Sequence, residues 1–133
     1  MATRRLFLLA VLVAWLLPLG LAQGKTFYWV SHGDPADPVW TYFLDGANQW
    51  AEDTGNTVRT SFHSGDVPKH QEAIRVAISA GADGIVTTSP DPGSLIEVAQ
   101  EARHAGIPII NFNTPDPDAN FNAYVGGDLV AYG

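Results

Sequence analysis

A loop of acidic, proline and aromatic residues contains the side chains of this sequence that are best suited to holding a small polar molecule. Asp37 lies in this loop, and Trp40 stands where an amphipathic pattern begins. The face of an indole ring can lie against the C–H groups of a sugar ring while nearby carboxylate and amide groups bond its hydroxyls. Trp40 also starts an apolar stripe that continues through Phe43 and Leu44. The pattern therefore leaves two roles open for Trp40, a binding wall or a core residue.

Residues that could carry out a reaction are scarce. The sequence contains no cysteine, no Gly-x-Ser-x-Gly nucleophile motif and no phosphate-binding Gly-x-x-x-x-Gly-Lys loop. A hydrolase would need a nucleophile paired with a base, and no such pair is recognisable. We therefore expect a binding protein rather than an enzyme, and no cofactor.

The four histidines do not show the close spacing of metal ligands. They are His32, His63, His70 and His104. We expect most of them to be solvent-exposed, with His32 and His63 in loops. Residues 116–120 resemble the opening of a calcium-binding loop, but Phe121 and Gly127 occupy the sixth and twelfth positions, where such loops need glycine and glutamate. The pattern favours a polar turn held by Asx hydrogen bonds, with no metal.

The first 22 residues have the pattern of a secretory signal peptide. Arg4 and Arg5 precede an uncharged apolar run over 6–17, and Gly20 and Ala22 are small residues that suit signal peptidase. An uncleaved membrane anchor is the alternative, but the apolar stretch is at the short limit for spanning a bilayer. We expect cleavage after Ala22, so that the mature chain is exported and is not embedded in the membrane.

The composition of residues 23–133 limits the possible partners. Fourteen acidic residues face five basic ones, which argues against a surface for nucleic acid. With no cysteine, the chain has neither disulfides nor a site for a lipid anchor behind the signal. We therefore expect a soluble protein in an enclosed compartment, which fits the periplasm.

The hydrophobic pattern alternates between strands and helices. Short apolar runs predict strands over 25–31, 57–62, 84–88, 107–112 and 123–126. Helices are predicted from Trp40, from about Val67 and from Leu95, where apolar residues recur at helical spacing. This order is typical of the α/β class, with a Rossmann-like open parallel sheet and helices on both faces. The strands then end along one edge, where ligands bind in such sheets.

The pattern stops shortly after the fifth strand. A further helix should begin there, with Asp128 as its N-cap, but the sequence ends at Gly133. We therefore expect residues 23–133 to form an incomplete lobe, with an apolar sheet face left uncovered. Half of a binding cleft should not bind a ligand tightly on its own.

Several segments in order resemble one family. They are the strand that ends in Ser31, the run Asp37, Pro38, Val39 and Trp40, the helix with Asp45, Gly46 and Ala47, and the segments 80–85, 105–113 and 124–128. Together they are similar to the periplasmic sugar-binding proteins of ABC transporters, the type I or ribose-binding-like group. The resemblance implies two Rossmann-like lobes that close on a ligand, of which this chain covers most of the first.

The resemblance also implies which side chains contact the ligand. By position, the implied contacts are Ser31, Asp37, Trp40, Asn113 and Asp128. Asp37 and Asn113 would bond sugar hydroxyls, and Trp40 would stack on the ring. Thr114 stands where ribose-binding relatives carry an arginine, which argues against ribose itself.

The family resemblance and the export signal together predict a solute-binding component of an ABC importer. Its ligand would be a small polar molecule such as a sugar, and its partner the transporter permease. An extracytoplasmic sensor that presents a bound sugar to a membrane receptor is the alternative. Repressors that share the fold work inside the cell, so the signal peptide argues against them.

Overall fold

The computed structural model describes residues 24–127. The expected signal peptide, residues 1–22, and the expected ligand contact Asp128 lie outside the described residues. The strands are β1 (Thr26–Ser31), β2 (Thr57–Phe62), β3 (Gly84–Thr87), β4 (Ile109–Phe112) and β5 (Ala123–Val125). The helices are α2 (Pro38–Thr54), α3 (Val67–Ser79), α4 (Ile96–His104) and the 3₁₀ turn η1 (Pro117–Ala119).

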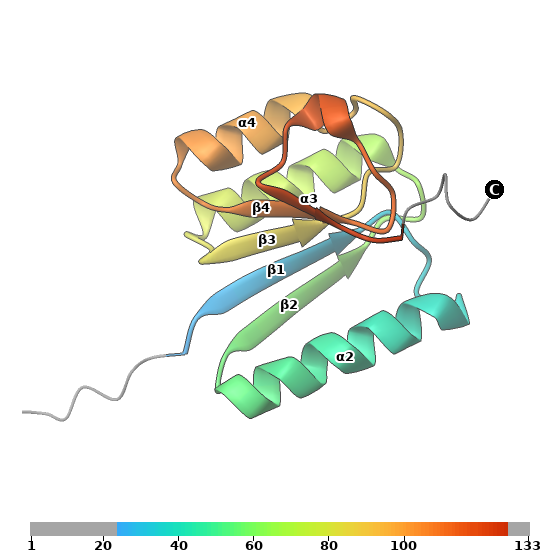
Figure 1. The fold of residues 1–133 in the computed structure, drawn as a ribbon, viewed down its shortest axis with the longest axis vertical. Helices are drawn as coiled ribbons and strands as arrows, with labels where there is room; N and C mark the ends of the chain where they lie inside the picture. The colour runs from blue at the N-terminus through green and yellow to red at the C-terminus, as the bar shows by residue number, and fades with distance from the viewer. Residues whose placement is uncertain (1–23, 128–133) are drawn as a thin grey trace, which may run out of the picture.

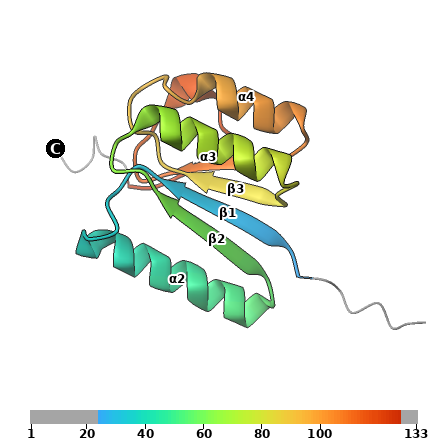
Figure 2. The ribbon, with the colours of Figure 1, turned by 180° about the vertical axis from the view of Figure 1, so that it is seen from behind.

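All the strand pairs are parallel, in the order β2-β1-β3-β4-β5. Phe27 pairs with Val58 of β2 on one side and with Gly84 of β3 on the other. The chain moves in one direction from β1 to β2 and returns past β1 to reach β3. Right-handed connections then place α2 on one face of the sheet and α3 and α4 on the other, as Figure 1 and the reverse view in Figure 2 show. The predicted Rossmann-like fold is confirmed.

Aspartates cap the amino-terminal ends of the first two long helices, and a glycine ends the first of them. Asp37 caps α2 by accepting a hydrogen bond from the backbone N–H of Val39, and Pro38 occupies the first helical position. Helix α2 therefore begins two residues before Trp40, where the apolar stripe suggested its start. Gly55 ends it in the left-handed conformation at φ 68°. Asp66 caps α3 in the same way, through the N–H of Lys69.

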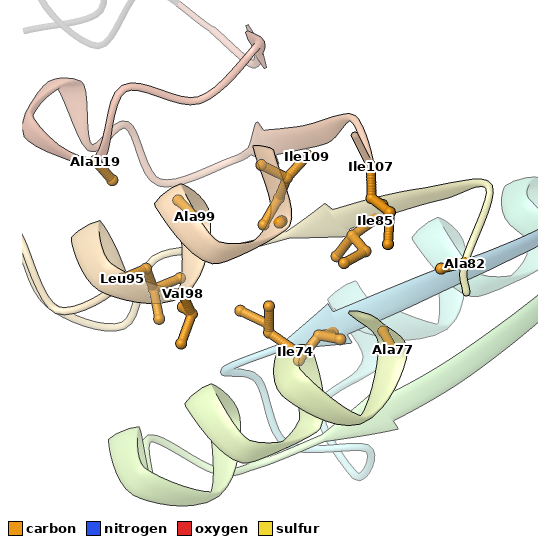
Figure 3. Close-up of a cluster of buried hydrophobic side chains, with 12 residues drawn as sticks. Ile74, Ala77, Ala82, Ile85, Leu95, Val98, Ala99, Ile107, Ile109 and Ala119 are labelled. Atoms are coloured by element: carbon orange, nitrogen blue, oxygen red, sulfur yellow. The ribbon is translucent and has the colours of Figure 1, made fainter. Parts of the chain in front are cut away.

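The main hydrophobic core lies between the sheet and helices α3 and α4. Figure 3 shows side chains from both helices meeting those of β3 and β4. Its members are Val30, Ile74, Ala77, Ala82, Ile85, Leu95, Val98, Ala99, Ala102, Ile107, Ile109 and Ala119. Their small and branched side chains pack closely, so this layer supplies a rigid base for the loops at the strand ends.

The opposite face of the sheet, under α2, is also apolar but less completely covered. A cavity of about 290 Å³ lies there, lined by residues that include Phe27, Trp29, Trp50 and Ile110. Trp50 is 42% exposed although its ring meets Phe27 edge-on at 5.1 Å. Within residues 24–127, helix α2 therefore leaves part of this apolar face open. No helix in that range is long and apolar enough to cross a membrane.

Candidate functional site at the carboxyl edge of the sheet

The carboxyl ends of the parallel strands lie along one edge of the sheet. The arrowheads of β1, β2 and β3 point to this edge in Figure 1. The loops that follow the strands therefore meet there, and two of the predicted site residues, Asp37 and Asn113, lie in them. In open α/β sheets such an edge is the usual place for a ligand.

The loop after β1 is held by its own polar side chains. Ser31 is fully buried, and its hydroxyl accepts a hydrogen bond from the N–H of Gly33 at 3.0 Å. The Asp34 carboxylate accepts from the N–H of Ala36 at 2.8 Å and from the hydroxyl of Ser64 at 3.1 Å. Because Ser64 follows β2, the second bond joins two neighbouring edge loops. In this structure the polar group of Ser31 shapes the loop.

Asp37 lies at the end of the same loop with an exposed side chain. One carboxylate oxygen, Oδ1, accepts the capping bond from Val39 over 3.1 Å. This bond satisfies one of the backbone N–H groups that have no partner within the first turn of the helix. Asp37 therefore combines a structural role with a charged group at the edge of the sheet.

Trp40 is a buried residue in this structure, with 6% of its surface exposed. Its indole packs against the backbone of Gly33, where an added Cβ would lie 2.1 Å from the ring. The ring also meets His32 and Phe112 edge-on, with centroids 5.5 and 6.3 Å away, and Phe43 at 5.8 Å. Of the two roles left open by the sequence, the core role is the one this geometry shows.

A threonine that the sequence pattern did not single out ties the first loop to β3. The hydroxyl oxygen of Thr88 accepts from the backbone N–H of His32 at 2.8 Å, and it lies 2.7 Å from Nδ1 of the same histidine. The hydroxyl hydrogen can then be donated to Nδ1, which leaves the proton of the neutral ring on Nε2. Burial lowers the pKa of His32, an effect that the nearby Asp91 partly opposes.

The expectation that most of the four histidines are solvent-exposed is wrong: His104 is exposed, but His32 and His63 are half-buried, and His70 is fully buried on α3. Its Nε2 lies 2.7 Å from the Thr87 hydroxyl, and burial lowers the pKa of His70 to about 3. The signal was its position one turn before Ile74 on the apolar side of the helix. His63 is half-buried with its ring centroid 5.4 Å from that of His70, and burial also lowers its pKa.

Asn113 follows β4 in a left-handed conformation at φ 64°, which asparagine tolerates better than most residues. Its N–H donates to Val125 at 3.0 Å and its carbonyl accepts from the hydroxyl of Tyr124 at 3.1 Å. The backbone is therefore anchored to β5 while the side chain is exposed. Asn113 and Asp37 thus both present polar side chains at the carboxyl edge.

The segment with a likeness to a calcium loop folds differently from the expected turn. Asp116 is 4% exposed, and its Oδ2 accepts from the Ser89 hydroxyl at 2.7 Å and from the N–H of Gly93 at 3.0 Å. The carboxylate therefore bonds another loop rather than its own turn. Within residues 24–127 no three His, Cys, Asp or Glu side chains are grouped to hold a metal.

Known proteins resemble this chain in both sequence and fold. Residues 27–133 match the family described as periplasmic binding protein domain. A D-apiose import binding protein from Actinobacillus succinogenes is 30% identical over 105 residues, which cover 74% of this chain and 34% of that protein.

Two solved structures are similar to this chain in three dimensions. A carbohydrate transporter protein from Acidothermus cellulolyticus, in complex with myo-inositol, has a TM-score of 0.76 at 30% identity over 82% of this chain and 39% of that one. A periplasmic sugar binding protein from Legionella pneumophila has a TM-score of 0.75 at 28% identity over 80% and 41%.

This chain thus spans about a third of the curated relative and about two fifths of these solved structures. The match nevertheless runs through every described strand and helix. This chain therefore belongs to the periplasmic binding protein family.

Proposed function

We propose that this protein is the solute-binding component of an ABC importer and that it captures a sugar in the periplasm. The observation that carries the proposal is the shared fold, at a TM-score of 0.76, with a carbohydrate transporter protein that binds myo-inositol. A relative named for D-apiose import adds a second sugar-related ligand. Both names describe transport, which favours an import role over the sensory alternative.

The ligand would be held by hydrogen bonds at the carboxyl edge. Asp37 would accept bonds from sugar hydroxyls, and Asn113 would both donate and accept. Both side chains are exposed there, and both stand on anchored backbone. The remaining proposed contacts are Ser31, Trp40 and Asp128. In this proposal, a sugar ring packs against Trp40 once the first loop yields to the ligand, and Ser31 holds that loop.

Binding would involve no covalent chemistry. The affinity of such a site comes from hydrogen bonds and ring stacking in a site that excludes water, and the loaded protein would then dock on the transporter permease. The export signal at residues 1–22 would deliver the chain to the periplasm, with Gln23 as the mature amino terminus. N-terminal sequencing of the exported protein tests this last point, and an intact Met1 or Ala2 would contradict it.

Calorimetric titration of the complete mature protein tests the proposed function. The sugars are D-apiose, myo-inositol and a panel of pentoses and hexoses, with free amino acids as the non-sugar comparison. We expect a dissociation constant in the range of about 1 μM or below for at least one sugar. Binding of amino acids with no response to any sugar would refute the proposal.

Alanine variants of two asparagines distinguish the proposed site from the rest of the surface. Asn113→Ala removes the proposed hydroxyl contact and should weaken sugar binding about tenfold, the cost of one or two hydrogen bonds. Asn48→Ala is the matched control, because Asn48 is also exposed but lies in the middle of α2, away from the carboxyl edge. Equal affinities of the two variants would remove Asn113 from the site.

A further inference from the structure

A buried carboxylate joins the two edge loops that follow β3 and β4. Asp116 belongs to the loop after β4, and its two partners, Ser89 and Gly93, belong to the loop between β3 and α4. The partners are 27 and 23 residues away along the chain. The bond from the Ser89 hydroxyl is 2.7 Å long, a good length for a hydroxyl donor. A single side chain thus bonds two positions of the neighbouring loop.

The two oxygens of Asp116 are used unequally. Both hydrogen bonds go to Oδ2, while Oδ1 is buried and has no partner among residues 24–127. One acceptor oxygen, Oδ2, is therefore enough for the contact between the loops. Asp116 also lines, together with Asn111, a cavity of about 340 Å³ beside β4 and β5. An asparagine amide could supply that oxygen through its carbonyl without burying a charge.

Asn113 lies three residues before this contact. The segment that carries it is anchored at one end by its backbone bond to Val125, and at the other by Asn122, which exchanges bonds with Ile109 of β4. Asp116 supplies the side-chain bond from this segment to the neighbouring loop. Farther along the segment, Arg103 of α4 donates to the carbonyls of Ala119 and Asn120, and Ala119 is buried in the core. Without Asp116, the stretch that loses its link to the neighbouring loop is therefore 114–117, which adjoins Asn113.

We propose that Asp116 is a positioning residue of the sugar site, which holds the loops after β3 and β4 at the spacing that binding requires. This inference rests on the proposed function. Asp116 does not touch the ligand itself. It acts by limiting the conformations of the free site, so that less ordering is needed when a sugar binds.

The test compares variants of the complete mature protein, titrated with whichever sugar of the panel binds the wild type. Asp116→Ala removes both bonds and should raise the dissociation constant about tenfold or more. Asp116→Asn keeps an acceptor and should restore the dissociation constant to within about threefold of the wild type. Asp118→Ala is the matched control, because Asp118 is an exposed aspartate of the same loop, and it should leave affinity unchanged.

Thermal unfolding without ligand distinguishes positioning from general stability. A merely structural role would lower the melting temperature of Asp116→Ala but leave its affinity intact at a temperature where the protein is fully folded. If Asp116→Ala does not fold, Ser89→Ala removes the hydroxyl that bonds Asp116, together with its longer contact to the Asp91 carbonyl, and should still weaken binding severalfold. Unchanged affinity in a folded Asp116→Ala or Ser89→Ala variant would overturn the inference, whereas a wild type that binds no sugar would overturn the proposed function instead.

Discussion

His70 on α3 donates a hydrogen bond through Nε2 to the hydroxyl of Thr87 in β3, over 2.7 Å. The direction follows from the second bond of the threonine, whose hydroxyl donates to the carbonyl of Thr88 at 3.1 Å and so accepts from the ring. The bond places a proton on Nε2, and because burial lowers the pKa of His70 to about 3, the ring is neutral near pH 7 and Nδ1 carries no proton. Its other nitrogen, Nδ1, is buried with no partner among residues 24–127.

The burial of neutral His70 makes folding stability depend on pH. Burial lowers its pKa from 6.5 to about 3 in the folded protein. As pH falls below 6.5 the unfolded chain takes up a proton that the folded chain excludes, so stability is lost between roughly pH 6.5 and 3. We expect His70 to lower the free energy of unfolding by about 2 kcal/mol at pH 5 relative to pH 7, measured by urea denaturation.

Two glutamine variants isolate this effect. His70→Gln can still donate to Thr87 but cannot titrate, so most of the slope between pH 7 and pH 5 should disappear. His104→Gln changes an exposed histidine at the end of α4 and should keep the slope. An unchanged slope in His70→Gln would show that another group causes the acid sensitivity.

Periodicity predicted the elements well, and its errors have local causes. Strand 57–62 has the predicted bounds and lies between two left-handed glycines, Gly55 and Gly65, which interrupt the extended chain on either side. The fourth strand begins at Ile109 rather than Ile107, since Pro108 has no N–H to donate and only its carbonyl joins the sheet, accepting from Ile85 at 2.9 Å.

The edge positions of Asp37 and Asn113 were also predictable, because each follows a predicted strand. The hydrogen-bond partners that join one edge loop to another could not be predicted from the sequence. Thr88 bonds His32, which is 56 residues away along the chain, and Asp116 bonds Ser89, which is 27 residues away. Such bonds depend on strand order, which periodicity does not determine, and so the buried roles of these residues emerge only in three dimensions.

The two roles of Asp37 can be separated by substitution. Asp37→Ser keeps a capping oxygen for the N–H of Val39 and should change the free energy of unfolding by less than about 0.5 kcal/mol, whereas Asp37→Ala should cost about 1 kcal/mol. If the carboxylate also bonds a sugar hydroxyl, both variants should lose affinity about tenfold in calorimetry. Wild-type affinity in Asp37→Ser would limit this residue to capping.

The close contact between Gly33 and Trp40 predicts opposite effects for two glycine-to-alanine changes. In Gly33→Ala the new methyl group would lie 2.1 Å from the indole, so the ring or the first loop must move, at a cost of about 1–3 kcal/mol. In Gly46→Ala the methyl meets no atom within 4 Å on α2, and the helix should gain about 0.5–1 kcal/mol.

Urea denaturation measures both changes, and tryptophan fluorescence should shift only in Gly33→Ala. Equal stability of the two variants would mean that the first loop adapts without cost. In that case Trp40 could also move easily to meet a ligand.

The ion pair between α3 and α4 should contribute modestly and depend on salt. Arg75 donates to Glu101 through Nε at 3.1 Å and through Nη2 at 3.0 Å, and this hydrogen bonding raises the pKa of Arg75. Glu97 lies 3.5 Å from the same Nη2 but is 78% exposed. We expect Glu101→Gln to cost up to about 1 kcal/mol at low salt, and Glu97→Gln almost nothing.

Denaturation in about 0.05 M and 1 M sodium chloride tests this ranking. At about 1 M the screening length falls to about 3 Å, so exposed charges attract each other much less than at low salt. The cost of Glu101→Gln should shrink at high salt, but not vanish, because Arg75 bonds both carboxylate oxygens and glutamine replaces one of them with an NH₂ group that cannot accept. A larger cost for Glu97→Gln than for Glu101→Gln would mean that geometry and partial burial do not decide which carboxylate holds the two helices together.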